Sequence, residues 1–108
     1  MSKNYKVIYS PQALQDITEI YEYICFILQN PLAAKNLSSR IRQTIRSLNT
    51  MPLRHPLVTW EPWNSLEMHQ VPIDNFTVFY RVDKENAIVT IIRIFYAGRD
   101  VQNISKNM

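Results

Sequence analysis

The sequence predicts an α+β fold: an N-terminal strand, an antiparallel helix hairpin and a three-stranded antiparallel meander, forming one sheet packed on the helices. A change in hydrophobic period supports this order. Apolar residues recur every three or four positions from residue 14 to residue 48, which is typical of amphipathic helices. From residue 67 onward the period changes to two, which is typical of strands. A chain of 108 residues is long enough for one domain, residues 1–108.

The first half of the chain contains the strand and both helices. Residues 5–9 are rich in β-forming side chains and predict a short strand. Ser10-Pro11 and Asn30-Pro31 each combine a capping side chain with proline at the first helical position. The short turn between the helices predicts a hairpin. We expect the helices to bury two apolar stripes: Leu14, Ile17, Ile20 or Tyr21, Ile24 and Ile27 or Leu28 on the first, and Ala34, Leu37, Ile41, Ile45 and Leu48 on the second.

The second half begins with a proline-rich loop and continues as strands. Strands are expected at residues 67–71, 76–82 and 87–96. The short turns between them predict the meander. Both faces of the last strand are largely apolar, so we place it centrally in the sheet. Residues 100–108 form a polar tail, expected to be disordered or to become ordered on binding.

The composition excludes several classes of protein. A hydrophobic content of 46% with 19% charged residues is typical of a folded globular chain. No apolar run reaches the roughly 18 residues of a membrane span, and the N-terminus does not resemble a signal peptide. Cys25 is the only cysteine, so it forms no internal disulfide, and no metal or phosphate-binding motif is present. We therefore expect a cytoplasmic protein without a cofactor, a metal ion or contact with a membrane.

Positive charge collects in the second helix. The segment from Lys35 to Arg54 contains five basic residues and no acidic residue. The preferred interpretation is that Arg42 and Arg46 pair across the hairpin with Asp16 and Glu19 on the first helix. The alternative is a basic face for nucleic acid or an acidic protein partner, since phosphate binding needs several such charges.

Four residues of the second half are candidates for catalysis or base stacking. Histidine is a residue type suited to general acid–base chemistry, which makes His69 a candidate, and Glu67 is expected on the same side of its strand. The preferred interpretation of both is a solvated polar face of an edge strand. Trp60 and Trp63 are able to stack on nucleic-acid bases, but such residues more often cap an exposed edge of the core.

Three arginines are candidates for binding a partner. Arg81 and Arg93 lie in apolar strands, where each is either paired or extends to the rim of the sheet. Arg99 directly follows Gly98, the only glycine of the chain, and its planar guanidinium suits phosphate or carboxylate. The alternative for Arg99 is a surface ion pair with an aspartate nearby, Asp100 or Asp83.

The chain resembles the RelE/ParE superfamily of toxins from type II toxin–antitoxin systems. The resemblance lies in the closing segment Ile-Ile-Arg-Ile-Phe-Tyr-Ala-Gly-Arg-Asp (residues 91–100), the strand-to-helix start at residues 9–17 and the central strand at residues 78–83. It covers nearly the whole chain. It implies a growth-inhibiting toxin, of the type associated with plasmid stabilisation, that is neutralised by a cognate antitoxin laid across its surface as a helix or an extended segment.

The resemblance leaves two mechanisms open. RelE-like toxins cleave mRNA on the ribosome with basic residues of the sheet and C-terminus, whereas ParE-like toxins inhibit DNA gyrase without catalytic residues. Arg99 matches the closing arginine of the family, but Thr77 stands where RelE-like chains often carry an arginine. Residues 101–106 also lack the tyrosine or histidine that RelE-like chains place there. We therefore favour the ParE-like mode, in which the protein is not an enzyme.

Each mechanism predicts its own set of functional residues. Target binding is expected to use Arg99, Arg93, Trp60 and Trp63. A ribosome-dependent endoribonuclease would draw its catalytic residues from Arg99, His69, Glu67 and Arg81. A third interpretation is an antitoxin-binding module that has lost its toxicity.

Overall fold

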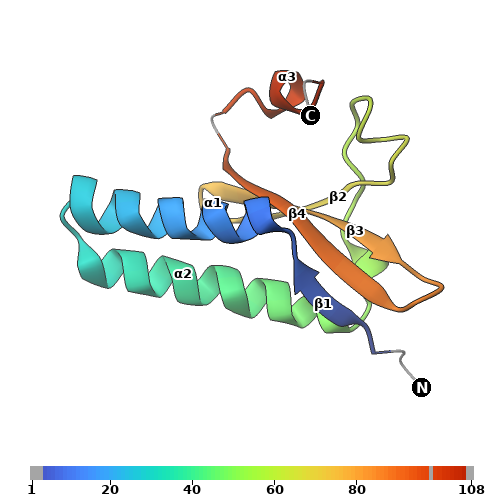
Figure 1. The fold of residues 1–108 in the computed structure, drawn as a ribbon, viewed down its shortest axis with the longest axis horizontal. Helices are drawn as coiled ribbons and strands as arrows, with labels where there is room; N and C mark the ends of the chain where they lie inside the picture. Colours follow the sequence, from blue (N-terminus) through green and yellow to red (C-terminus); the bar gives the residue numbers. More distant parts are fainter. Residues whose placement is uncertain (1–3, 98, 107–108) are drawn as a thin grey trace.

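The computed structural model describes residues 4–97 and 99–106, and it confirms the predicted α+β fold. Four strands form one sheet in the order β1-β4-β3-β2 (Figure 1). The strands are β1 (Lys6–Tyr9), β2 (His69–Ile73), β3 (Phe76–Asp83) and β4 (Ile88–Tyr96). The helices are α1 (Pro11–Glu22), which continues as the π-helical turn η1 (Tyr23–Ile27), α2 (Pro31–Arg46) and α3 (Val101–Lys106); the 3₁₀ turns η2 (Ser47–Asn49) and η3 (Pro52–Arg54) follow α2.

The predicted caps begin both long helices. The Oγ atom of Ser10 accepts a hydrogen bond from the backbone N–H of Ala13 at 3.0 Å. The Oδ1 atom of Asn30 does the same for Ala33 at 3.1 Å. The two helices lie side by side as an antiparallel hairpin on one face of the sheet (Figure 1).

The main core lies between this hairpin and the sheet. All five apolar positions predicted for the second helix are buried, which confirms that stripe, and Leu37, Ile41, Ile45 and Leu48 belong to this core. The stripe predicted for the first helix is partly wrong, because Leu14 is 49% exposed and Leu28 is 56% exposed. Ile17 is buried as predicted, and helix α1 turns Ala13 and Asp16 inward beside it. In η1 the N–H of Leu28 reaches the carbonyl of Tyr23, and this wider turn leaves the end of the stripe, Ile27 included, in solvent.

Strand β4 is central, as predicted. It pairs in parallel with β1 and antiparallel with β3. The strict alternation of faces expected along β4 is wrong, because the register with β3 shifts between Phe79 and Tyr80, which pair with Arg93 and Ile91. Ile92 is the extra residue of this bulge. Ile91 and Ile94 consequently face the same main core.

A second core covers the opposite face of the sheet. The connecting segment before β2 and the C-terminal helix α3 pack there against strands β3 and β4 (Figure 1). Its buried members are Val58, Trp63, Met68, Phe79, Phe95 and Val101, and Trp60, Ile92 and Ile104 pack against them. The prediction of a disordered tail is therefore wrong for residues 101–106, because Val101 and Ile104 dock one side of α3 on this core. None of the helices in the described ranges is long and apolar enough to span a membrane.

Candidate functional site

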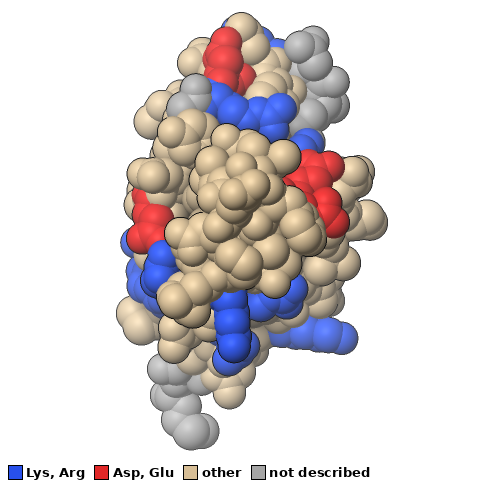
Figure 2. All heavy atoms as spheres, turned by 90° about the vertical axis from the view of Figure 1, so that its left-hand side faces the viewer, with Lys and Arg blue, Asp and Glu red and all other residues tan. Residues whose placement is uncertain are grey.

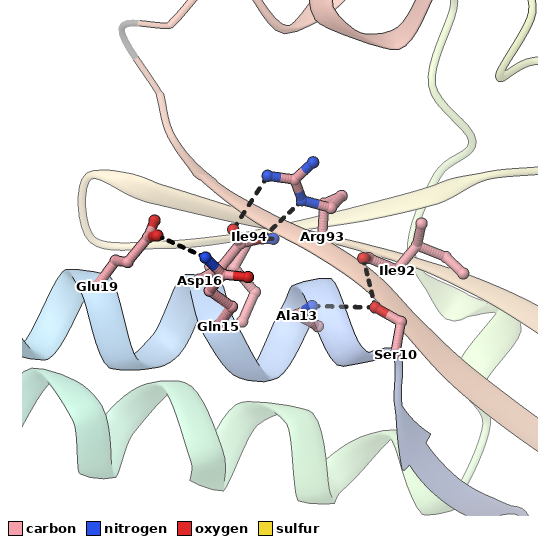
Figure 3. Close-up of polar contacts among 8 residues, drawn as sticks. All are labelled: Ser10, Ala13, Gln15, Asp16, Glu19, Ile92, Arg93 and Ile94. Atoms are coloured by element: carbon pink, nitrogen blue, oxygen red, sulfur yellow. Dashed lines mark hydrogen bonds and ion pairs between the residues drawn. The ribbon is translucent and has the colours of Figure 1, made fainter. Parts of the chain in front are cut away.

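Helix α1 is fixed to the sheet where strand β1 ends. The last pair of the parallel ladder is Tyr9 with Ile91. Beyond it, the hydroxyl of Ser10 donates a hydrogen bond to the carbonyl oxygen of Ile92 at 2.8 Å (Figure 3). One residue therefore both caps α1 and extends the hydrogen bonding along the edge of β4.

The carboxylate of Asp16 completes this edge. Its Oδ2 atom accepts hydrogen bonds from the backbone N–H of Ile94 at 2.9 Å and from Nε of Arg93 at 2.8 Å (Figure 3). Its Oδ1 atom accepts from Nη2 of Arg93 at 3.1 Å. Asp16 is 6% exposed. A carboxylate this buried is tolerated because each oxygen has a charged or backbone donor.

The pair that Asp16 forms overturns the predicted charge pairing of the hairpin. Asp16 forms its ion pair with Arg93 of strand β4, and Glu19 accepts a hydrogen bond from Gln15 of its own helix (Figure 3). Arg42 and Arg46 remain exposed on α2, and the predicted pairs with Asp16 and Glu19 are wrong. For Arg93 the pairing alternative is confirmed. Its use in binding a target stays a prediction.

A groove of about 950 Å³ opens between the hairpin and the end of the sheet. Its walls are largely apolar and include Ile20, Ile24, Leu28, Leu37, Phe76 and Tyr96. Charges stand at its margin: Nη2 of Arg40 is 2.7 Å from Oδ2 of Asp74, and Arg99 also lines the groove. An open apolar groove with charged margins suits an amphipathic peptide segment.

Arg99 is exposed beside this groove. Its guanidinium carbon lies 5.1 Å from the ring centroid of Phe95, and its backbone N–H donates to the carbonyl of Tyr96 at 3.0 Å. Within the described ranges no carboxylate pairs with Arg99, so the alternative of an ion pair with a nearby aspartate is not realised. Gly98, predicted to present this arginine, lies outside the described residues.

The two tryptophans cap the second core, as the preferred interpretation predicts. Trp63 is 3% exposed, and its ring centroid lies 4.9 Å from that of Phe79. Trp60 stacks on Trp63 with ring centroids 6.3 Å apart, and its Nε1–H donates a hydrogen bond to Oγ of Ser105 at 3.1 Å. This packing accounts for both residues. Their participation in target binding stays a prediction.

His69 is buried rather than solvated, so the expectation of a polar strand face is wrong. Its ring stacks on Tyr80 with centroids 5.1 Å apart, and its Nδ1 atom lies 2.8 Å from the carbonyl oxygen of His55. The Tyr80 hydroxyl donates to the carbonyl of Pro52 at 2.6 Å, and burial raises the pKa of Tyr80. The segment before β2 passes alongside that strand, through the bridge between Leu57 and His69, and covers the histidine.

His55 completes this cluster with an unsatisfied nitrogen. Its Nε2 atom is buried and has no hydrogen-bond partner within the described part of the chain. Burial, followed by the positive charges of Arg54 and His69, lowers the pKa of His55 below its usual value. The neutral ring is therefore the form that the fold accommodates.

Glu67 and Arg81 lie away from His69. Both are exposed and line a smaller, polar pocket of about 590 Å³ on the sheet. Arg81 donates from Nε to the carbonyl of Leu66 at 2.9 Å. Glu67 precedes β2 with a positive φ of 56°, so it does not share a strand face with His69. The prediction that these two side chains point to the same side is wrong.

The structure therefore leaves the four nuclease candidates in three places. His69 is enclosed beside Tyr80, Glu67 and Arg81 share the smaller pocket, and Arg99 lies at the groove. Asp16 was expected to pair with the second helix, and its contact with β4 was not predicted; the signal for its inward position was a carboxylate between Ala13 and Ile17 on the buried face of α1. In the described part of the chain, no three metal-binding side chains of His, Cys, Asp or Glu come together.

Comparisons with known proteins connect this fold to toxins. The sequence profile described as "ParE toxin of type II toxin-antitoxin system, parDE" matches residues 7–101. No curated protein matches in sequence. The fold is similar to that of the chromosomal ParDE toxin–antitoxin system from P. aeruginosa, with a TM-score of 0.69 and 18% identity over 88% of this chain and 98% of the other.

Two further solved structures share the fold. The toxin–antitoxin complex RelBE2 from Mycobacterium tuberculosis gives a TM-score of 0.64 and 18% identity over 86% of this chain and 98% of the other. A mutant of the E. coli toxin RelE in the free state gives a TM-score of 0.64 and 10% identity over 97% of this chain and 99% of the other. At these identities the likeness concerns the fold.

Replacing the buried carboxylate of Asp16 should weaken the contact between α1 and β4. Asp16→Asn leaves Arg93 without its countercharge, and we expect the free energy of unfolding to fall by about 3 kcal/mol. This value is at the low end of the range for breaking a buried ion pair, because the Arg93 side chain retains some contact with water. Urea denaturation measures this loss. The matched control Glu19→Gln removes an exposed carboxylate one turn later and should cost about 0.5 kcal/mol or less. Equal losses of stability in the two variants would show that Asp16 does not hold α1 against β4.

Acid should destabilise the fold through His55. Its folded pKa lies below the value near 6.5 of the unfolded chain, so the unfolded chain takes up the proton first as the pH falls. The contribution of His55 to stability is thus fully present above about pH 6.5 and declines below it. Urea denaturation from pH 8 to pH 5 should show this decline, and His55→Gln should flatten it. A variant with an unchanged pH profile would rule out His55 as the source.

Proposed function

Because the chain belongs to the ParE toxin family of type II toxin–antitoxin systems, we propose that it is a growth-inhibiting toxin that acts in the cytoplasm by binding DNA gyrase. The observation that supports a binding mechanism is the dispersal of the nuclease candidates over three separate places. In this proposal the protein needs no cofactor and performs no catalytic step on its target.

The chemistry of RNA cleavage explains why this dispersal matters. Attack by a 2′-hydroxyl needs a proton acceptor, a proton donor and a charge stabiliser within hydrogen-bond reach of one phosphate. His69 has one ring nitrogen engaged by His55 and one ring face covered by Tyr80. Arg99 has no acid–base partner among the candidates beside it. A binding surface needs none of this convergence.

We further propose that the groove between the hairpin and the sheet receives a segment of a cognate antitoxin. Two similar structures are described as a ParDE toxin–antitoxin system and a RelBE toxin–antitoxin complex. In this chain the groove offers apolar walls for a helix or an extended segment and an exposed guanidinium, Arg99, for an acidic side chain. Leu28 is 56% exposed there, so a partner would remove much apolar surface from water.

Gyrase inhibition is tested with the purified protein, purified gyrase and relaxed plasmid. We expect the protein to stop negative supercoiling, and Arg99→Ala to raise the concentration needed by about tenfold or more, since a hydrogen bond to a charged group contributes about 1.5–3 kcal/mol. The control Arg81→Ala removes an exposed arginine from the smaller pocket and should inhibit as well as the parent.

Induced expression in bacteria separates the three mechanisms. Inhibition of gyrase predicts DNA-damage signalling and filamentous cells with intact mRNA. Codon-phased cuts in translated mRNA that Arg99→Ala abolishes would instead establish the endoribonuclease. Growth without any defect would identify an antitoxin-binding module that is not toxic.

The groove predicts which surface change blocks neutralisation. Leu28→Lys should leave the toxin active but weaken binding of the antitoxin encoded beside it by roughly 10- to 100-fold, since a buried leucine contributes about 1.5–3 kcal/mol. The control Leu32→Lys places the same charge on a side chain that is 68% exposed and does not line the groove. Growth during co-expression provides the readout. Rescue of Leu28→Lys equal to that of the parent would remove the groove from the proposal.

A further inference from the structure

The outer face of α2 is basic along its whole length beyond the first turn. Its exposed side chains carry hydrogen-bond donors and no carboxylate: Lys35, Asn36, Ser39, Arg40, Arg42, Gln43 and Arg46. No large apolar residue is exposed between Leu32 and Met51. The sequence has no acidic residue from position 23 to position 60. We call Lys35, Ser39, Arg42 and Arg46 the basic face of α2.

The charges of this face are not used by the fold. Arg40 beside it pairs with Asp74, and Arg54 beyond it donates to the carbonyls of Thr50 and Met51, so these two arginines have structural roles. Lys35, Arg42 and Arg46 form no ion pair with any carboxylate of the described residues. Three cations are therefore left facing solvent on one helix.

Their spacing places them on one line. At about 100° per residue, Lys35, Arg42 and Arg46 lie within about 40° of one another around the helix axis, and the rise of about 1.5 Å per residue spreads them over about 17 Å. Ser39 falls on the same line between them. In Figure 2, one group of Lys and Arg atoms lies on the lower side of the molecule, the side of α2 in Figure 1, with acidic atoms above it, and another group lies near the top beside acidic atoms.

The chemistry of the face favours phosphate over an acidic protein. The centres of protein interfaces combine arginine with aromatic and apolar side chains and are poor in lysine, whereas phosphate oxygens receive hydrogen bonds from Arg, Lys, Ser and Asn. The basic face combines its two arginines with lysine and serine and has no aromatic or apolar side chain. The large apolar side chains that the hairpin exposes lie elsewhere, most of all at its tip, where Phe26 and Ile27 are each 68% exposed.

From these observations we infer that the basic face of α2 binds the sugar–phosphate backbone of duplex DNA, independently of base sequence. The choice of DNA over RNA rests on the proposed action on gyrase, an enzyme that works on DNA. The three cations neutralise phosphates and release counterions, so binding is expected to weaken steeply with salt. The face would then hold the toxin against the DNA that its target engages.

Fluorescence anisotropy with the whole chain and a labelled 20-base-pair duplex of random sequence tests this inference. We expect binding at 50 mM salt and a negative slope of log K against log salt. Arg42→Gln/Arg46→Gln removes about two phosphate contacts, so the slope should become shallower by about 1.8. Raising the salt from 50 to 200 mM should therefore weaken DNA binding by the double variant about twelvefold less than it weakens binding by the parent. Both arginines are exposed, so the fold should tolerate glutamine.

The single variants Arg46→Gln and Lys106→Gln form the matched comparison, because each removes one positive charge, the first from α2 and the second from α3. Only Arg46→Gln should reduce the slope by about 0.9. Equal effects would overturn the inference, since general charge would then explain the binding. No duplex binding at 50 mM salt, or stronger binding to an RNA duplex or a glutamate-rich peptide, would also overturn it. A toxin that binds DNA normally but does not inhibit gyrase would contradict the proposed function and leave this surface intact.

Discussion

The contact of the Asp16 carboxylate with β4 is the constraint on which the arrangement of the helices depends. Strand β1 covers the edge of β4 only as far as Ile91, and Asp16 satisfies the next free N–H group, that of Ile94, while binding Arg93. A carboxylate with three donors fixes the rotation of α1 about its own axis. Because α2 packs along α1, the same contact sets the distance between hairpin and sheet, and therefore the groove that both Asp16 and Ile94 line.

In the part of the chain that the structure describes, the aromatic residues in the middle of β3 and β4 are covered on both faces of the sheet. The main core fills one face, and the segment before β2 together with α3 fills the other around Phe79 and Phe95. Besides the smaller polar pocket on the sheet, the exposed surfaces include three at the hairpin: the apolar groove, the apolar tip and the basic face of α2. These surfaces differ in chemistry, so each suits a different partner. Such a distribution is consistent with a toxin that acts through binding.

Local signals in the sequence were sufficient for much of the fold. The caps Ser10 and Asn30 and the stripe of α2 were predictable, because each depends on residues a few positions apart. The orientation of α1 was not, since the partner that turns Asp16 inward lies 77 residues later in the chain. The bulge at Ile92 reversed the faces of β4, and no local residue marked it. The prediction of the candidate site was the least accurate. It grouped His69 with Glu67 by assuming that side chains alternate regularly between the two faces of one strand, whereas Glu67 precedes β2.

Amide hydrogen exchange at Ile94 tests the role of Asp16 most directly. If the carboxylate takes the place of a neighbouring strand, the N–H of Ile94 should be protected nearly as well as that of a residue hydrogen-bonded within the ladder. In Asp16→Ala this amide should exchange much faster, while amides in the β3–β4 ladder retain more of their protection. Slow exchange at Ile94 in that variant would contradict the role of Asp16, because another group would then be closing the edge of β4.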